Sequence, residues 1–313
     1  MDNSDPRLCE AAEKIAFLRP LSPYPGWRFN IDWDHGAEGF GARRKLWQEC
    51  KDLGKFLPVV IPWHHGTQVE IVLSNDVSQQ VFIGGCIEPN EMAFLDRFLQ
   101  PGMTFIDVGA NEGLFTLLGG AKVGPSGTVW AFEPSQRELR QLQANVHRNP
   151  NLPVEVFPCA LANRSGTAAL KIAEATHAGQ NTLGEFGYKI GAEADEVVSV
   201  RKLDDLVTER QLKRLDLIKI DVEGAEAKVV EGAGRTLEKF RPVVLFEVME
   251  KALISQKSSV IRLLNQFRAL NYRFLGFCAH SGLETPWDPD KMPIPSDNIL
   301  AWPKERPFSV PLG

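Results

Sequence analysis

Short apolar runs alternate with amphipathic segments along most of the chain. Five of the runs have the length and composition of strands buried on both faces: 103–108, 127–132, 154–158, 217–222 and 242–248. The segments between them, such as 135–148 and 258–270, carry apolar residues at helical spacing. Strands that alternate with helices predict an α/β fold with a doubly wound, mostly parallel sheet.

Two more predicted strands, 272–277 and 298–302, have only a proline-rich loop between them. Without a helical crossover they can pair as an antiparallel hairpin at one edge, which predicts a seven-stranded sheet. The strand-like runs 167–172 and 196–200 bracket a polar, glycine-flanked loop, Gln180-Asn181-Thr182. This loop either closes over a site or is an ordinary exposed loop.

Residues 1–85 are expected to form an N-terminal extension, and residues 86–313 the main domain. The pattern predicts a helix in 1–19, a β-hairpin over 57–73 and a third short strand at 81–83. We interpret His64 and His65 as turn or surface residues, and His177 likewise. Residues 26–50 are rich in aromatic and charged groups, and we assign no regular secondary structure to them. They either pack as a cap or homodimer arm, or line the acceptor site.

Composition narrows the classes of function. The 313 residues are 43% hydrophobic, with a net charge of −5, so they suit one large α/β domain and show no nucleic-acid footprint. No apolar run reaches the roughly 18 residues of a membrane span, and the N-terminus lacks the pattern of a signal peptide. The five scattered cysteines argue against a disulfide framework or a zinc ribbon, which favours a cytoplasmic location.

The first buried strand runs into a glycine turn, Gly109-Ala110-Asn111-Glu112-Gly113, followed by a helix. A strand, a glycine turn and a helix N-terminus form a nucleotide-type site, in which Gly113 is expected to let helix and strand approach. Asn111 stands where the dinucleotide fingerprint has the glycine that admits a pyrophosphate. Asp107, at the end of the strand, suits a positively charged ligand better than phosphates.

The second strand ends in Glu133-Pro134, 20 residues after Gly113. An acid at about this offset binds the two ribose hydroxyls of a nucleoside cofactor. A ribose-binding acid without a diphosphate platform predicts S-adenosylmethionine and disfavours a nicotinamide oxidoreductase. Ser135 is expected to cap the next helix.

Three blocks in this order, 105–113, 132–134 and 217–226, resemble the FkbM family of class I S-adenosylmethionine-dependent methyltransferases. The likeness covers about residues 101–250. It implies transfer of a methyl group to a hydroxyl of a sugar or polyketide-type small molecule. The implied cofactor-binding residues are Asp107, Gly109, Ala110, Asn111, Gly113, Glu133, Pro134, Ser135, Ala160, Leu161 and Asp221. The acid that often binds adenine is absent beside Cys159 and Ala160, which leaves Asn163 as a candidate.

The expected catalytic residues are Glu223, Asp221, Glu247 and Lys219. Strand alternation places Lys219 on the same face as Asp221, so it is either a catalytic group or half of a structural ion pair. The three acids can activate a hydroxyl or hold a hard cation. No histidine–carboxylate cluster with ligand spacing appears, so we assign no metal. Methylation of nitrogen or carbon, and a non-catalytic nucleoside-binding or scaffold protein, are the alternatives.

Overall fold

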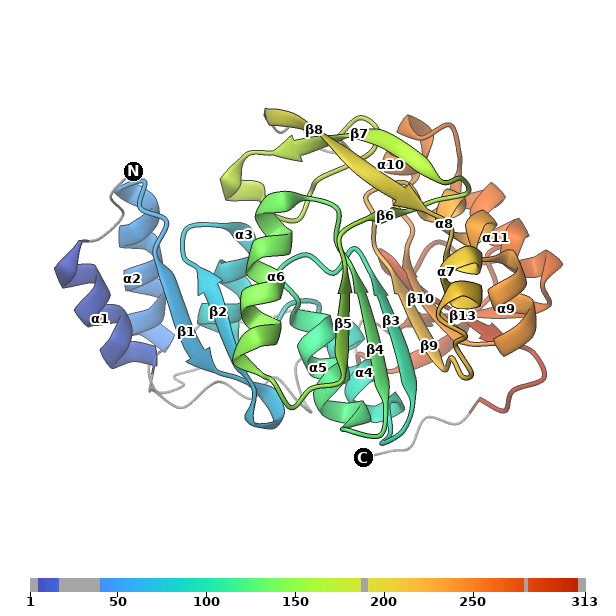
Figure 1. Cartoon of the computed structure of the whole chain (residues 1–313), viewed down its shortest axis with the longest axis horizontal. Coiled ribbons are helices and arrows are strands. Elements are labelled where there is room, and N and C mark those ends of the chain that lie inside the picture. Colours follow the sequence, from blue (N-terminus) through green and yellow to red (C-terminus); the bar gives the residue numbers. More distant parts are fainter. Residues whose placement is uncertain (1–4, 17–39, 187–190, 279–280, 309–313) are drawn as a thin grey trace.

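The computed structural model describes residues 5–16, 40–186, 191–278 and 281–308. Its centre is an eight-stranded sheet with the order β12-β11-β13-β10-β9-β3-β4-β5 (Figure 1). Five neighbouring strands are parallel and end at the same edge. These are β3 (Thr104–Val108), β4 (Thr128–Phe132), β5 (Val154–Phe157), β9 (Leu217–Ile220) and β10 (Val243–Glu247).

The remaining strands correct the predicted count. β13 (Asn298–Pro303) pairs antiparallel with β11 (Tyr272–Phe277), as predicted, but it lies between β11 and β10. The eighth strand, β12 (Glu284–Trp287), comes from the proline-rich loop and pairs with β11 at the sheet edge. It contains Pro286, and an edge strand tolerates a residue that has no N–H to donate.

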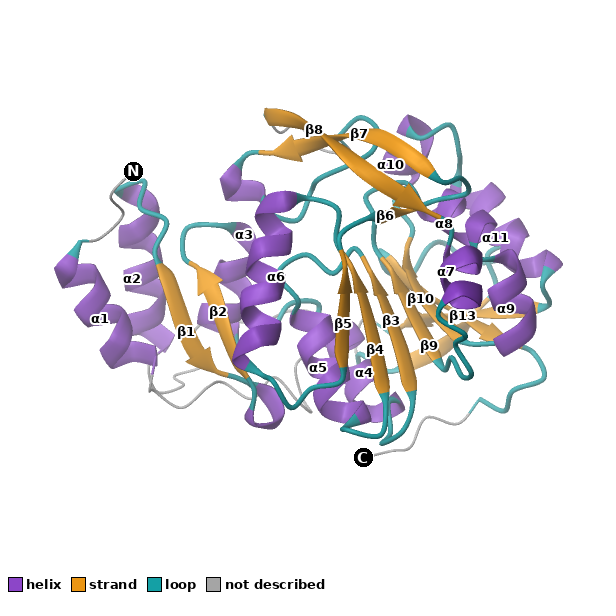
Figure 2. Cartoon of the chain, in the orientation of Figure 1, coloured by secondary structure: helices purple, strands orange, loops and turns teal. Residues whose placement is uncertain are grey.

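Helices cover both faces of the sheet, so the predicted doubly wound α/β architecture is confirmed (Figure 2). One face carries α4 (Pro89–Phe98), α5 (Leu114–Val123) and α6 (Gln136–Arg148). The other carries α7 (Leu203–Glu209), α8 (Glu226–Gly232), α9 (Gly234–Phe240), α10 (Glu250–Ser255) and α11 (Val260–Ala269). Neighbouring strand residues enter opposite cores: Phe105 belongs to the core that contains α5, and Ile106 to the core that contains α8 and α11. Apolar residues at consecutive positions are therefore required.

The N-terminal part contains the predicted first helix, α1 (Pro6–Ala16), and a second helix, α2 (Phe40–Asp52). The predicted hairpin is also present, formed by β1 (Pro58–Pro62) and β2 (Gln68–Val72) around the short turn η1 (His64–Gly66). Residues 17–39 of the unassigned aromatic region lie outside the described residues.

The strand predicted at 81–83 is wrong. After the short helix α3 (Asp76–Ser78), these residues belong to a π-helical segment, η2 (Gln79–Gly84), and all three are buried. Three consecutive apolar residues carry no period that separates helix from strand. Leu8, Trp47 and Phe82 share one hydrophobic core with α4 and α5, so the N-terminal elements pack on the main sheet. The domain boundary at residue 85 stays a prediction.

A second, three-stranded sheet lies above the carboxyl ends of the parallel strands (Figure 1). It contains β6 (Ala160–Leu161), β7 (Gly166–Ala173) and β8 (Ala192–Arg201). The predicted strands 167–172 and 196–200 thus pair antiparallel, but in this separate sheet. The connection between β7 and β8 includes the turn η3 (Ala175–His177). Among the described residues, no helix has the length and apolar character needed to cross a bilayer.

Candidate active site

The site lies where the direction of strand addition reverses. From β3 the chain adds β4 and β5 on one side, and it later adds β9 and β10 on the other. The loops that follow β3 and β9 therefore separate above the sheet and leave a crevice, the usual place for a ligand in such folds.

Two adjoining cavities occupy this crevice and share Gly109, Asn111, Asp221 and Glu223 in their walls. The first, the β4 cavity, has Phe132, Glu133, Ala160 and Leu161 in its wall and about 580 Å³ of space, including its open mouth. The second, the β9 cavity, has Glu88, Phe115, Lys219 and Glu247 in its wall and about 900 Å³.

Gly109 is required by a close approach of two loops. Its φ is +82°, and a Cβ there would lie 1.8 Å from the backbone oxygen of Asp221. Gly113 also has a positive φ, +92°, but it faces Leu142 of α6 and not the sheet. The close contact between α5 and β3 is made by Gly119, whose Cβ would lie 2.4 Å from the Phe105 ring. The expected role of Gly113 in helix–strand packing therefore belongs to Gly119.

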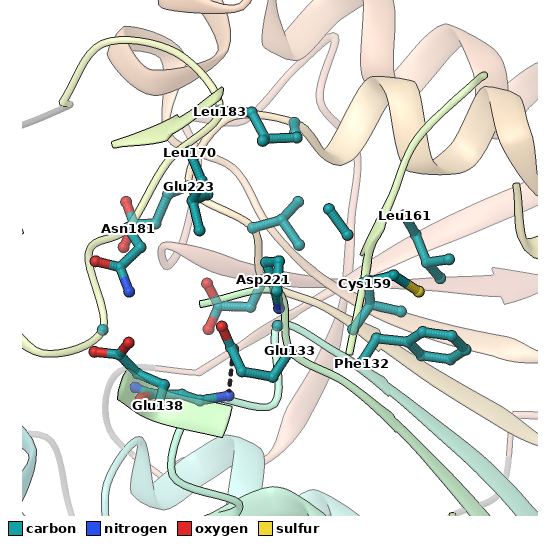
Figure 3. A pocket seen from close by; sticks show the side chains of 18 residues that line it. Phe132, Glu133, Glu138, Cys159, Leu161, Leu170, Asn181, Leu183, Asp221 and Glu223 are labelled. Carbon is teal, nitrogen blue, oxygen red and sulfur yellow. Dashed lines mark hydrogen bonds between the residues drawn. The ribbon is translucent and has the colours of Figure 1, made fainter. Parts of the chain in front are cut away.

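Glu133 is held in place by the backbone of the two turns beside it. Its Oε2 accepts a hydrogen bond from the Asn111 N–H and its Oε1 from the Ser135 N–H, both at 2.9 Å. The residue is 5% exposed, and burial raises the pKa of its carboxyl to about 8. Each oxygen keeps a lone pair for a further donor, and the carboxyl group lies at the wall of the β4 cavity (Figure 3).

Ser135 does not cap α6 with its side chain. It stands at the N-cap position, but its hydroxyl donates to the carboxylate of Glu138 and no side-chain cap bond is present. Pro134 lines the β4 cavity, whereas Ser135 contributes only its backbone N–H to Glu133.

The wall opposite the acids is apolar. Ala160 and Leu161 form β6 and line the β4 cavity together with Phe132 and Cys159. Figure 3 shows the side chains of Phe132, Cys159 and Leu161 at this wall. Asn163, the candidate for adenine, is not brought to the cavity, because its amide donates to Glu231 at the surface. Among the described residues, no lysine, arginine or histidine lines the β4 cavity.

Asp107 lies beneath the glycine turn and lines neither cavity. It is 1% exposed, and its Oδ2 accepts a 2.6 Å hydrogen bond from the Thr116 hydroxyl of α5. Its Oδ1 is buried without a hydrogen-bond partner, and burial raises the pKa of the carboxyl. Ala110, the neighbour of Gly109, does line the β9 cavity.

The predicted catalytic acids come together at the ends of β9 and β10. Asp221 follows β9, Glu223 adopts a left-handed conformation in the next turn, and Glu247 ends β10. One oxygen from each carboxylate lies within 4.8 Å of the other two. Burial, followed by repulsion from Asp221, raises the pKa of Glu223 to about 8 and raises that of Glu247 well above its ordinary value.

Lys219 forms a structural ion pair, which was one of the two roles that the sequence left open for it. Its Nζ is 2.6 Å from Asp221 Oδ2 and 4.5 Å from the centre of the Phe115 ring, and the residue is 3% exposed. Burial alone would lower the pKa of this amine, but the nearby carboxylates of Asp221, Glu88 and Asp107 outweigh burial and raise it.

Glu88 is a site residue that the sequence does not reveal. It precedes α4 in a left-handed conformation and lines the β9 cavity, and burial raises its pKa to about 8. In the sequence it is only an acid before Pro89, at a helix start. No local pattern shows that this helix start faces the end of β9.

The β7–β8 connection covers the crevice. Gly179 contributes to both cavities, and the Thr182 hydroxyl donates to the backbone oxygen of Glu223 at 2.8 Å. The loop of Gln180, Asn181 and Thr182 thus closes over the site. His177 lines the β9 cavity and contacts Asp76 at 2.7 Å. His64 and His65 line neither cavity.

Comparison with known proteins identifies the family. The model of the FkbM methyltransferase domain matches residues 107–274. The chain is 31% identical over 159 residues to the 31-O-demethyl-FK506 methyltransferase FkbM of Streptomyces tacrolimicus, an alignment covering 43% of this chain and 60% of that protein. It is 26% identical over 154 residues to the 2-O-methyltransferase NoeI of Sinorhizobium fredii, covering 45% and 62%. The chain thus spans about three fifths of the length of these relatives.

Among solved structures, the chain is similar to the FkbM methyltransferase of Methylobacillus flagellatus, with 17% identity and a TM-score of 0.40. That alignment covers 73% of this chain and 55% of the other. The family model begins at Asp107, continues through the glycine turn and the three acids, and spans more than half of the chain. The chain therefore belongs to the FkbM methyltransferase family.

Proposed function

We propose that this protein transfers a methyl group from S-adenosylmethionine to a hydroxyl group of a small molecule. The observation that carries the proposal is the acidic character of the crevice wall. The acids that line the β4 cavity are Glu133, Glu138, Asp221 and Glu223, and no basic group lines it among the described residues. Such a wall suits a nucleoside that carries positive charge and no phosphate.

The residues present fit this cofactor. The two oxygens of Glu133 each keep a lone pair, which suits the two ribose hydroxyls. Phe132, Ala160 and Leu161 offer an apolar surface for a purine ring. S-adenosylmethionine, when bound, supplies a methyl group that is already activated for displacement. The protein therefore mainly has to align the acceptor and exclude water.

The β9 cavity is the proposed place for the acceptor. It adjoins the β4 cavity at Gly109 and Asp221 and is covered by the β7–β8 connection. An alcohol is a weak nucleophile near neutral pH, so a nearby proton acceptor should increase the rate by about 10²–10⁴-fold. Asp221 is engaged by Lys219, which leaves Glu223 and then Glu247 as the better placed groups to attract the hydroxyl proton.

Transfer to an oxygen is supported by the names of the two relatives, and a sugar or polyketide alcohol remains the proposed type of acceptor. One is named for the 31-O position of FK506 and the other for 2-O-methylation. The wall of the β9 cavity is acidic, so it would repel an acceptor that carries a phosphate or carboxylate beside the reacting hydroxyl.

Calorimetry with the full chain tests the cofactor. We expect S-adenosylmethionine and S-adenosylhomocysteine to bind with a stoichiometry near one, and NAD and NADP not to bind. Binding of a nicotinamide dinucleotide, or of none of the four, would overturn the proposal.

Transfer of a labelled methyl group to a panel of monosaccharides and polyketide alcohols tests the reaction. Glu223→Gln should abolish transfer and leave S-adenosylhomocysteine binding largely intact. Binding without transfer to any member of a broad panel would favour the non-catalytic alternative.

A further inference from the structure

We propose that Asp221, Glu223 and Glu247 bind a divalent cation of the Mg²⁺, Mn²⁺ or Ca²⁺ type at the floor of the β9 cavity. The inference deepens the proposed function, because the cation would lie where the acceptor hydroxyl has to be activated. Ligand spacing in the sequence does not show this site, since two ligands follow β9 and the third ends β10.

The geometry suits one coordination sphere. A hard cation binds carboxylate oxygens at about 2.0–2.6 Å, so two ligands on opposite sides of it are roughly 4–5 Å apart. The three carboxylates each place one oxygen within 4.8 Å of the others. Lys219 uses Oδ2 of Asp221, which leaves Oδ1 of that residue for the cation.

A second observation comes from two oxygens without partners. Glu247 Oε2 and Glu88 Oε2 are both buried and have no hydrogen-bond donor among the described residues, and both residues line the β9 cavity. A buried carboxylate oxygen without a donor is costly, typically by 1–3 kcal/mol or more. A cation bound among these groups would satisfy the oxygen of Glu247 directly and that of Glu88 through a coordinated water.

The balance of charge favours a divalent cation over an organic ammonium. Glu88, Asp221, Glu223 and Glu247 face the cavity, while Lys219 is its one lysine or arginine among the described residues and already pairs with Asp221. A bound cation requires these acids to ionise together, and a single further positive charge would leave most of the resulting repulsion in place. Three oxygen ligands with open positions also match the way Mg²⁺ and Mn²⁺ keep waters or substrate oxygens.

The cation would give the acids a defined role. A hydroxyl that coordinates a divalent cation loses its proton more readily, as a metal-bound water does. The carboxylates would then act as ligands that position the hydroxyl, and the proton could leave to a neighbouring carboxylate or to solvent.

The test uses the full chain, freed of metal with a chelator and titrated with Mn²⁺ by calorimetry and by electron paramagnetic resonance. We expect one Mn²⁺ per chain, with the affinity lowered by at least about tenfold in Glu247→Gln and in Glu223→Gln. Glu155→Gln is the matched control, since Glu155 lies on β5 and pairs with Arg210 at the surface. Melting temperatures and S-adenosylhomocysteine binding confirm that each variant is folded.

The outcomes separate this site from the proposed function. Absence of Mn²⁺ binding, or equal binding by the wild type and both cavity variants, would overturn the metal site even if S-adenosylhomocysteine binds normally. Binding of glucosamine without binding of Mn²⁺ would also overturn it and would assign the acids to an ammonium group. Mn²⁺ bound with the expected losses would support the site even if the cofactor assignment fails.

Discussion

Replacing Glu133 with glutamine is the most informative single change in the cofactor region. The carboxyl group already accepts one backbone N–H on each oxygen, and we propose that each oxygen also accepts one ribose hydroxyl. The amide keeps one oxygen and presents an NH₂ group in place of the other. That NH₂ cannot accept from the ribose or from the backbone N–H that faces it.

The expected loss follows from these contacts. One charge-assisted hydrogen bond to the ribose disappears, and such bonds contribute about 1.5–3 kcal/mol. S-adenosylhomocysteine should therefore bind about 10- to 150-fold more weakly to Glu133→Gln at a pH where the wild-type carboxylate is ionised. The unliganded fold should be little affected near pH 7, because a carboxyl with a pKa of about 8 is mostly protonated there and the amide resembles that form.

The pH dependence has a definite sign. The pKa of Glu133 is raised in the folded chain to about 8, so folding takes up a proton between about pH 4.5 and 8. The contribution of this residue to stability is therefore greatest at low pH and is lost as the pH rises through that window. We propose that the cofactor binds the ionised form, so its binding should strengthen from pH 6 to pH 9. Both dependences should be reduced in the glutamine variant.

Calorimetry with S-adenosylhomocysteine at pH 6, 7.5 and 9, with urea unfolding at the same pH values, measures both effects. The difference in affinity between wild type and variant should be largest at pH 9. Glu155→Gln, at the exposed edge strand β5, should behave as the wild type does. Equal affinities for the wild type and Glu133→Gln at pH 9 would refute the assignment of Glu133 to the ribose.

Two further predictions concern the framework of the site. Gly109→Ala should abolish S-adenosylhomocysteine binding, because its Cβ would lie 1.8 Å from a backbone oxygen, whereas Gly124→Ala, with φ of +62° and open space, should retain it. Calorimetry on both variants decides this, and normal binding by Gly109→Ala would contradict it. Asn145→Ala should lower the free energy of unfolding by about 3 kcal/mol, because the buried amide makes three hydrogen bonds to backbone atoms. Urea unfolding beside the exposed control Asn265→Ala measures it, and equal midpoints would contradict it.

Much of the fold is predictable from local pattern. Phe105 and Ile106 are neighbours, and both are apolar because each enters a different core. A run of this kind fits only a strand covered on both faces, so the five parallel strands follow from the sequence. The missed elements had weaker patterns. β12 contains a proline, and 81–83 is too short to show a period.

Part of the site can likewise be predicted from the sequence, and part cannot. Gly109, Asn111 and Glu133 lie at the ends of two strands that are consecutive in the chain, so their nearness follows from local order alone. The nearness of Glu88 to Glu223 and Glu247 cannot be predicted from local order. It depends on where the start of α4 lies relative to the end of β9 and on the pairing of β10 with β9.

The sequence by itself therefore determined the doubly wound fold, the glycine turn and the acid that we propose binds the ribose. Only the tertiary structure decided that Lys219 pairs with Asp221, that Glu88 lies in the same cavity, and that the β7–β8 connection covers both. The physical reason is that hydrophobic periodicity reflects which side chains of one helix or strand are buried and toward which face they point. The meeting of side chains from distant elements depends on strand order and packing, which no local pattern encodes.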